Sequence, residues 1–565
     1  MGHTRDARPA RRPLFREALR ILTAIIAPTA FGNALEYLPV ASGLAIVGRQ
    51  PLSDARLAQE LDAMMLARAY FNLVAMAPGF GVITALRTLC PQAVGARRED
   101  ALPIYLQRAF LLILAMSAPA IALLLLSERI LLLAGQPAEL ARLARPYCVR
   151  LIPQYFGCVG MSAIQRVYQA LGYNWANTLI CLVVCAAAPA LQWLFVVQLE
   201  QGYLGAAVAS AWYNLAYLCL QLPHLAFLGR ASLFRPHVEA LRLAGLREFV
   251  ALTLPGFLMV CAEWWVLELA VLASGWLTPP ALTIGAFSIA STVQALTLMA
   301  WIGLAVAASV EVGTHIGAAD VPAARRAAAC VLALGVAMAS ACAGCLLAWR
   351  HSIARLFTSS APINELTARL LPFTGLIAVL DATSNTLGGV CSGLGLQRFA
   401  AASQLLGYYV VGIPIGVVLA FVVLHGERDG VFGLCTGTAA AMLTSSALVT
   451  ITLLRHDWGL AADAAERRLS SNALADETSL SRMRKSAKCV RQVSVAPEED
   501  AANLEACQPD ISTGCGQLSD TEPTKKSCNN QSHKRFHSSR KAFCIGQANV
   551  GDSMPLRLAE DLACS

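Results

Sequence analysis

Long apolar runs dominate residues 20–455 of this 565-residue chain, and short polar stretches separate them. A helix that crosses a bilayer needs about 20 apolar residues, and each run is long enough for one. The runs are continuous rather than alternating, which excludes a membrane β-barrel, because the strands of such barrels alternate and span about ten residues. The pattern predicts an all-α polytopic membrane protein with twelve spans: 21–47, 63–86, 104–126, 147–171, 178–198, 203–228, 249–274, 282–308, 327–349, 369–393, 400–424 and 431–454.

The composition supports a membrane protein up to about residue 460 and changes abruptly there. The chain is 56% hydrophobic and only 14% charged, whereas soluble domains carry nearer a quarter of charged residues. Every lysine lies at position 485 or later, in a polar segment with few aromatic residues. Such a segment cannot bury enough apolar surface to fold alone, so we expect a disordered tail. Of the 18 cysteines, twelve lie in the apolar part as small hydrophobes, and we expect no metal site.

The apolar part contains a repeat. The run 79–96 begins with Gly-Phe-Gly and ends with Gly-Ala, and a matching run 222 residues later ends with Gly317 and Ala318. Glu36 and Glu263 each lie eight residues after a proline, in the first apolar segment of their copies. Six spans separate the copies, so both copies cross the membrane in the same direction. This predicts two six-helix lobes related by a pseudo-two-fold axis along the membrane normal, as in parallel-repeat transporters.

Charge predicts the topology of these parts. A basic N-terminal segment, 1–20, is expected in the cytoplasm by the positive-inside rule. The N-lobe would cover 21–228 and the C-lobe 249–456, joined by a cytoplasmic loop, 229–248. The tail, 457–565, would return to the cytoplasm because the number of spans is even. This topology fits the plasma membrane as well as a vacuolar or other organellar membrane.

Four acids stand inside apolar spans: Glu36, Glu263, Glu268 and Asp381. A carboxylate at the bilayer centre is unfavourable by roughly 2.5–3.5 kcal/mol on insertion scales, so it usually serves an ion path, a proton relay or a counter-ion. The alternative is a protonated acid that only joins two helices. Because Glu36 and Glu263 occupy matching places in two repeats, we favour a functional role.

Glu263 is the strongest single candidate for a binding residue. Trp264 and Trp265 follow it, and indole faces attract cations, so a pocket for an organic cation is possible on sequence grounds, with packing or lipid contact as the alternative. Glu268 lies about 140° further round the helix, so the two glutamates cannot face the same narrow spot. One of them would face a cavity while the other bonds a neighbouring helix.

Glu36 is the corresponding acid of the N-lobe, with Asn33 on the same helix face. Pro28 and Pro39 bracket it, and prolines bend helices by leaving carbonyls without a donor. A hinge linked to protonation and two ordinary kinks are both compatible with this pattern. A buried carboxyl group is stable when it binds either a proton or a cation, but not when it binds neither. The proton and the cation then compete for the same group, and in thermodynamic terms this competition couples their transport as an antiport.

Four segments resemble the multidrug and toxic compound extrusion (MATE) family in its eukaryotic form. They are 79–96, 261–268, 303–325 and 388–416, which resemble the family's helices two, seven, eight, and ten to eleven. The resemblance implies a twelve-helix, two-lobe antiporter that exports organic compounds, often cations, against protons or sodium. By position, Glu263 and Glu268 match family acids on helix seven implicated in substrate and proton binding. Asp381 matches a helix-ten acid that is usually Glu, and Asn33 matches a polar helix-one residue, and we expect both to belong to the same binding site.

The chain also departs from the family pattern. Thr292 stands where animal members carry a further Glu, Phe287 replaces a nearby polar residue, and Gly43 falls at the helix-one Asp of bacterial members. We hypothesise that Glu36 replaces part of this missing acidity. Arg87 replaces a helix-two acid, and an ion pair of Arg87 with Glu311 across a gate is a further hypothesis.

The leading prediction is a proton- or sodium-coupled antiporter for organic cations, xenobiotics or metabolites. Alternatives are export of organic anions such as carboxylates, for which Arg87, Arg150 and Arg166 are candidate residues, and a flippase for an amphipathic lipid. An enzyme is not expected, since no nucleophile elbow, HExxH motif or nucleotide-binding phosphate loop stands in a convincing context. We expect no cofactor, no nucleic-acid partner, and a monomer that binds a small organic substrate within the bilayer.

Overall fold

The computed structural model describes residues 14–470, apart from positions 52 and 359. Helices form nearly all the regular structure of this part, as the apolar runs predicted. Most of the predicted N-terminal segment and of the tail, residues 1–13 and 471–565, lies outside the described residues.

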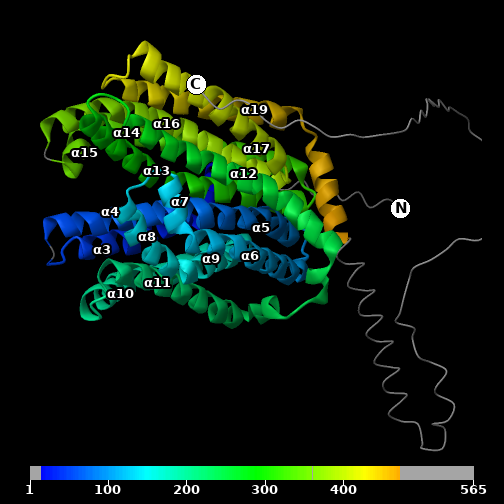
Figure 1. The fold of residues 1–565 in the computed structure, drawn as a ribbon. Coiled ribbons are helices and arrows are strands. Elements are labelled where there is room, and N and C mark those ends of the chain that lie inside the picture. Colours follow the sequence, from blue (N-terminus) through cyan, green and yellow to red (C-terminus); the bar gives the residue numbers. More distant parts are fainter. Residues whose placement is uncertain (1–13, 52, 359, 471–565) are drawn as a thin grey trace, which may run out of the picture. The chain divides into compact units, whose positions relative to one another are not determined.

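The N-lobe is built from helical segments that follow one another through short turns (Figure 1). Several of them continue through π-helical turns, labelled η, and so form one longer helix. In chain order they are α1 (Leu14–Ile21), η1 (Leu22–Ile26), α2 (Ala27–Leu35), α3 (Leu38–Val47), α4 (Asp54–Phe71), η2 (Asn72–Met76), α5 (Ala77–Gly95), α6 (Leu102–Leu125), α7 (Ser127–Leu133), α8 (Ala138–Arg150), α9 (Ile152–Ala170), α10 (Asn174–Trp193), η4 (Leu194–Gln198) and α11 (Gly202–Leu225).

The C-lobe repeats this plan with fewer interruptions. Its segments are α12 (Leu243–Ser274), α13 (Pro280–Gly317), α14 (Val321–Ala348), α15 (Arg350–Phe357), α16 (Ala361–Leu394), α17 (Gln397–Leu405), η8 (Leu406–Gly412), α18 (Ile413–Val417), η9 (Val418–Val423) and α19 (Gly430–Arg455). The helix α12 begins at Leu243, five residues before the predicted end of the inter-lobe loop, so the joining segment is shorter than the sequence indicated.

Ten of the described helical segments are long and apolar enough to cross a membrane. The consecutive helices α8 and α9, and the helix α11, complete the twelve predicted spans, and they pack among the others. The helices α12, α13 and α16 extend beyond the apolar runs at one or both ends. Hydropathy therefore located the spans but missed these extensions, because their residues are more polar than the span centres.

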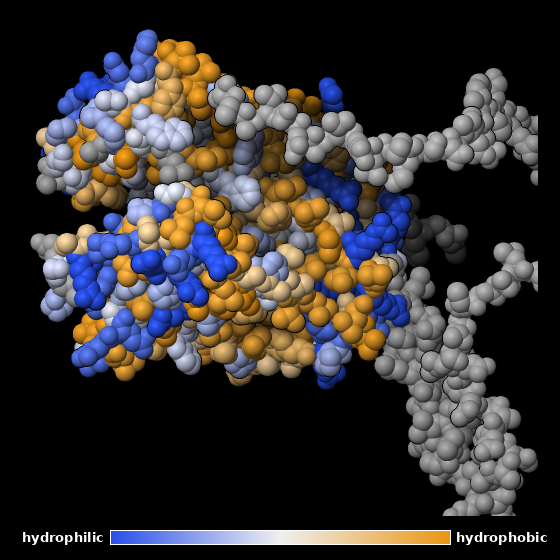
Figure 2. Space-filling model, in the orientation of Figure 1, coloured by the Kyte–Doolittle hydropathy of each residue, from blue (hydrophilic) through white to orange (hydrophobic). Residues whose placement is uncertain are grey.

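The two lobes lie side by side and meet at one end of the molecule. Figure 1 shows the N-lobe in blue to teal and the C-lobe in green to orange. At the end where α3 and α15 lie, the surface is hollowed between the lobes (Figure 2). At the opposite end, α5 packs against both α12 and α13. We call the contact zone of α5 with α13 and α16 at this end the seam.

Two glycines of the sequence repeat make the seam possible. A Cβ on Gly95, at the end of α5, would overlap the Thr314 carbonyl, and a Cβ on Gly317, at the end of α13, would overlap the Gln92 carbonyl. Both Gly317 and Thr314 lie 222 residues after their counterparts, so the two contacts are related by the pseudo-two-fold symmetry. The repeated glycines allow the backbones of the two lobes to approach closely.

Polar side chains of α5 also bind the end of α16 across the seam. Thr88 Oγ1 donates to the Ser392 carbonyl at 2.5 Å, and Gln92 Nε2 donates to the Gly393 carbonyl at 2.8 Å. The last carbonyls of a helix have no partner within the helix. Here α16 ends at Leu394, followed by Gly395 in the left-handed conformation (φ +78°), whose amide donates to the Ser392 carbonyl, and side chains of the other lobe add donors to two of the terminal carbonyls.

The first span is broken at Glu36. Here α2 ends at Leu35 and α3 begins at Leu38, and the Tyr37 amide donates to the Ala34 carbonyl three residues back. Pro39 has no amide hydrogen to continue the α-helical pattern, as the sequence indicated. The two halves of the span also pack differently, since η1 contacts α13 of the C-lobe whereas α3 contacts α10 of the N-lobe.

Residues 458–470 form one more helix after α19, which we call the crossing helix. It is visible in orange beside the seam in Figure 1. The expected start of a disordered tail at residue 457 is wrong, because residues 458–470 are helical. Trp458, Ala462 and Leu469 are at most 8% exposed, so the helix is held by packing that a composition argument does not detect.

We predict that Gly95→Ala destabilises the protein, because its Cβ would meet the backbone of Thr314 rather than a movable side chain. Overpacking of this kind destabilises by about 1–3 kcal/mol. Gly344→Ala in α14 is the matched control, since no atom lies within 4 Å of its added Cβ. Thermal unfolding in detergent should show a lower melting temperature only for Gly95→Ala, and equal melting temperatures would contradict the close seam.

Candidate functional site

A cavity in the C-lobe brings together two of the predicted acids. Glu263 from α12 and Asp381 from α16 both line a space of about 210 Å³. The helix α13 supplies Ser291 and Gln294 to the same space, and the remaining lining residues are Val271, Ala295 and Leu298. None of these seven lining residues is basic. The cavity therefore combines two carboxyl groups with neutral polar and apolar walls, an arrangement suited to a positively charged ligand.

Asp381 is held in place by its own helix. It is 2% exposed, and Asn385 Nδ2, one turn later, donates to its Oδ1 at 2.8 Å. Tyr408 in η8 is also buried and senses the charges of both acids. Glu263 and Asp381 likewise act on each other electrostatically. Such a pair binds protons as a unit, so the occupancy of one acid affects the other.

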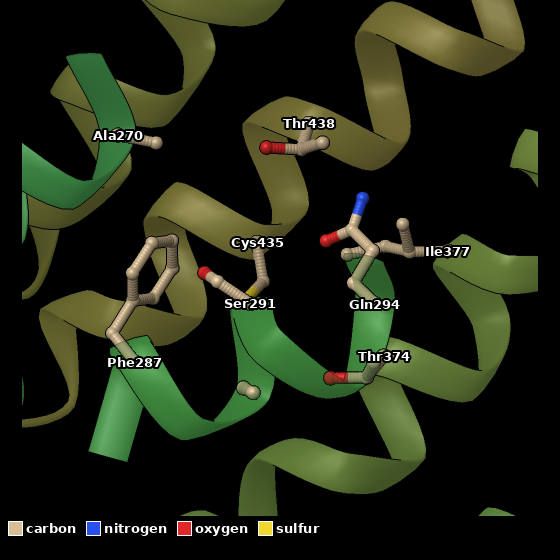
Figure 3. Close-up of a pocket in the computed structure, with 9 residues that line it drawn as sticks. Ala270, Phe287, Ser291, Gln294, Thr374, Ile377, Cys435 and Thr438 are labelled. Atoms are coloured by element: carbon tan, nitrogen blue, oxygen red, sulfur yellow. The ribbon is translucent and has the colours of Figure 1, made fainter. Parts of the chain in front are cut away.

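A smaller cavity adjoins the acids. It shares Ser291 and Gln294 with the acid cavity, and its volume of about 20 Å³ has room for about one water molecule. Figure 3 shows these two side chains reaching into it from α13, with Thr438 on α19 and Thr374 on α16 nearby. Four polar side chains are enough to hold a water molecule beside the acid pair.

The structure separates the predicted tryptophans from this cavity. The ring of Trp264 lies 6.0 Å from that of Phe80 on α5, and so it packs between the lobes. Trp265 is 40% exposed, and neither indole lines the space beside Glu263 and Asp381. Glu268 belongs to α12, but its side chain lies outside the described residues.

The N-lobe holds a second group of charges, around the break in the first span. Glu36 Oε1 and Asn33 Nδ2 are buried without hydrogen-bond partners. Glu36 is influenced electrostatically by Arg166 on α9, and Arg166 is also influenced by Arg87 on α5. Arg87 in turn senses Glu263. These charges influence one another at a distance. Some polar atoms of Glu36, Arg87 and Arg166 therefore stay buried without a hydrogen-bond partner.

The predicted ion pair of Arg87 with Glu311 is wrong. Glu311 on α13 pairs instead with Arg20 of α1 at 2.7 Å, with His315 at 4.0 Å. The Nε and Nη2 atoms of Arg87 are buried without a hydrogen-bond partner. The seam is therefore closed by backbone contacts, by Thr88 and Gln92, and by Arg20, rather than by a salt bridge from Arg87.

Comparison with known proteins decides the family. A family model described as MatE matches residues 28–191 and again residues 255–418, which together are more than half of the chain. The chain belongs to the MatE family. The two matches are 227 residues apart, the spacing of Pro28 and Pro255, so each lobe carries one copy of the family domain.

Relatives and solved structures agree with this assignment. The chain is similar to multidrug and toxin extrusion protein 1 of Homo sapiens, with 31% identity over 82% of this chain and 79% of that protein. It is similar to Protein DETOXIFICATION 36 of Arabidopsis thaliana, with 30% identity over 73% of this chain and 81% of that protein. The crystal structure of the eukaryotic MATE transporter AtDTX14 matches with a TM-score of 0.74 and 25% identity, over 81% of this chain and 100% of that one. The MATE resemblance inferred from sequence is confirmed, and the protein is a multi-pass membrane transporter.

Two departures from the MATE pattern now have a structural context. Thr292 is exposed and its Oγ1 donates to the Ser288 carbonyl at 2.8 Å, so it points away from the acid cavity. Gly43 packs on the side chain of Gln192 in α10, which an added Cβ would approach to 3.1 Å. Phe287 is 7% exposed and lines the one-water cavity.

Sequence reasoning missed several polar residues of this MATE site. Gln294 and Ser291 line the acid cavity, and their spacing of three residues with Leu298 four further on marks one face of a helix. Asn385 lies four residues after Asp381, where a helical side chain can reach it. These spacings were readable in the sequence. The proximity of Arg166 to Glu36 was not, because it depends on how α9 packs.

We predict energetic coupling between Arg20 and Glu311 in a double-mutant cycle of the MATE protein. Because Arg20 is half exposed, the coupling should be modest, roughly 0.2–1 kcal/mol. Arg20→Ala, Glu311→Ala and the double variant would be compared by unfolding in detergent. The matched cycle of Arg87→Ala with Glu311→Ala should show additivity. Coupling in the second cycle but not in the first would restore the Arg87 hypothesis.

Proposed function

We propose that the protein is a secondary antiporter that exports organic cations in exchange for protons. The observation that carries this proposal is the C-lobe cavity, which is lined by Glu263 and Asp381 and by no basic residue. An uncompensated carboxylate is strongly unfavourable in a bilayer, so each acid favours a bound proton or a bound cation over an empty charged state. A proton and a cationic substrate then compete for the same oxygens.

Competition alone gives exchange only if the site opens to one side at a time. The lobes meet at the seam and are separated at the other end, where the surface is hollowed (Figure 2). We propose that the seam is the cytoplasmic end, because the basic N-terminal segment precedes α1 there. In this conformation the site would be open to the outside. Rocking of the two lobes about the cavity would expose it to the cytoplasm.

A specific observation keeps organic anions as the second candidate substrate class. Arg87 and Arg166 both bear buried guanidinium nitrogens without partners, and a substrate carboxylate would satisfy them. Both belong to the N-lobe and neither lines the acid cavity, although Arg87 acts electrostatically on Glu263. We favour cations because the side chains that line the acid cavity include two acids and no basic residue.

The main experiment is gradient-driven flux in proteoliposomes. An outward-directed proton gradient should drive uptake of labelled tetraethylammonium, and Glu263→Gln and Asp381→Asn should each abolish it, since a neutral amide binds neither a proton nor a cation strongly. Glu427→Gln, an exposed acid in the loop before α19, is the control and should retain the flux. A sodium gradient and labelled citrate would be tested in the same vesicles.

The alternatives give different results in that experiment. Flux driven by sodium but not by protons would show that sodium is the coupling ion. Gradient-driven citrate flux would favour an exporter of organic anions. Tetraethylammonium flux that persists in Glu263→Gln would contradict the competition mechanism. Loss of flux in Glu263→Gln together with unchanged flux in Glu36→Gln would refute our hypothesis that Glu36 replaces missing acidity.

Gln294 tests the cavity independently of charge. A hydrogen bond to a charged partner contributes about 1.5–3 kcal/mol, so Gln294→Leu should raise the concentration for half-maximal tetraethylammonium transport about tenfold or more. Thr292→Val is the matched control, two residues away on the exposed face of the same helix, and should change it less than about twofold. Equal effects of the two variants would remove Gln294 from the site.

A further inference from the structure

The crossing helix, residues 458–470, has one apolar face and one polar face. Its buried residues recur at the spacing of a helix face: Trp458, Ala461, Ala462, Ala465 and Leu469. Its exposed positions include Asp463, Glu466 and Arg467. Asp457 Oδ1 accepts a hydrogen bond from the Gly459 amide at 2.9 Å and so caps the start of the helix. The segment is therefore an amphipathic helix with a defined docking face.

The first half of this face packs on the C-lobe. Trp458, Ala461 and Ala465 belong to the same apolar cluster as Ile316 and Ala324, near the end of α13 and the start of α14. The guanidinium of Arg325 lies over the Trp458 ring, 5.5 Å from its centre. The Trp458 indole also donates to the Leu453 carbonyl at 3.1 Å. The beginning of the crossing helix is anchored to the lobe that precedes it in the chain.

The second half of the face reaches the N-lobe side. Leu469 belongs to the apolar cluster of Leu89 and Tyr105, on α5 and α6. Arg468 Nη1 donates to Gln92 Oε1 at 2.8 Å, and Arg468 Nε lies 3.3 Å from a carboxylate oxygen of Glu248, at the start of α12. Burial lowers the pKa of Arg468, and the Glu248 charge opposes that shift. One helix of 13 residues thus contacts both lobes.

The residue that Arg468 contacts is itself part of the seam. Gln92 Nε2 donates to the Gly393 carbonyl at the end of α16, so its amide group is held from both sides. A Cβ on Gly317 would also overlap the Gln92 carbonyl. Separation of the lobes at this end must break the Gln92–Gly393 bond. It must also either break the Arg468–Gln92 bond or pull the crossing helix from the C-lobe.

We propose that the crossing helix is a latch that stabilises the conformation in which the seam is closed. This inference rests on the proposed alternating access, since a transporter must open this end in each cycle. Undocking of the latch from Gln92, and of its Leu469 from the apolar cluster of Leu89 and Tyr105, precedes or accompanies that opening. A segment outside the twelve spans therefore sets the balance between the two conformations, by contributing binding free energy to only one of them.

Arg468→Ala in the full-length protein tests the latch, with the exposed neighbour Arg467→Ala as the matched control. Hydrogen–deuterium exchange in detergent reports opening of the seam through the amides of residues 88–95 and 313–317. Loss of one hydrogen bond weakens the closed state by about 1 kcal/mol, so exchange of both segments should rise roughly fivefold in Arg468→Ala only. Trp458→Ala, paired with the exposed Leu460→Ala, should give the same result from the other end of the helix.

Two results would overturn the latch. Equal exchange at the seam in Arg468→Ala and Arg467→Ala would show that the contact with Gln92 does not hold the seam closed. Faster exchange that spreads to α10, which is remote from the crossing helix in sequence, would indicate general destabilisation instead. The exchange measurement needs no substrate, so it is independent of the flux experiment. Absence of tetraethylammonium flux would refute the proposed antiport without deciding the latch, and unchanged exchange at the seam would refute the latch without deciding the antiport.

Discussion

Satisfaction of the last carbonyls of α16 is the constraint on which this conformation depends. Within a membrane protein no backbone polar group can remain without a partner, and the end of a helix always leaves several. Thr88 and Gln92 of the opposite lobe donate to two of these carbonyls, those of Ser392 and Gly393, and the repeated glycines let the helices come close enough. The seam is therefore stable when closed, and it can open only where water replaces these donors. This requirement fits an end of the molecule that faces an aqueous compartment.

The two lobes share a plan but differ in charge. In the C-lobe, Glu263 is influenced by Arg87 but shares its cavity with a second acid, Asp381, whereas in the N-lobe the corresponding acid, Glu36, is influenced by Arg166. A carboxyl group beside a guanidinium has its charge partly balanced, so it competes less strongly for an added cation. After the duplication of the domain, the equivalent sites are thus chemically unequal. A division of roles between the lobes follows from this difference.

Much of the architecture was predictable because hydropathy and the internal repeat can be read directly from the order of residues along the chain. The twelve spans and the break at Glu36 between Pro28 and Pro39 follow from residue spacing and symmetry, whereas the meeting of Glu263 with Asp381 depends on how α12 and α16 pack. The partner of Glu311, the separation of the tryptophans from Glu263 and the docked crossing helix depend on packing between distant segments. The short apolar face of residues 458–470 was readable at helical spacing, but only the fold shows which surface covers it.

The first span packs partly on the N-lobe and partly on the C-lobe, and this determines the order in which the protein can assemble during its synthesis. Ile21, Ile25 and Ile26 belong to an apolar cluster with Trp301 and Leu304 on α13, and Arg20 meets Glu311, 291 residues away in the chain. At about 5–20 residues per second, the ribosome makes those partners roughly 15–60 s after the first helix emerges. The start of the first span must therefore wait in the bilayer with its C-lobe face uncovered while the rest of the N-lobe assembles. A newly made N-lobe is in this respect an incomplete folding unit, and it becomes complete only when the second copy of the domain has been inserted.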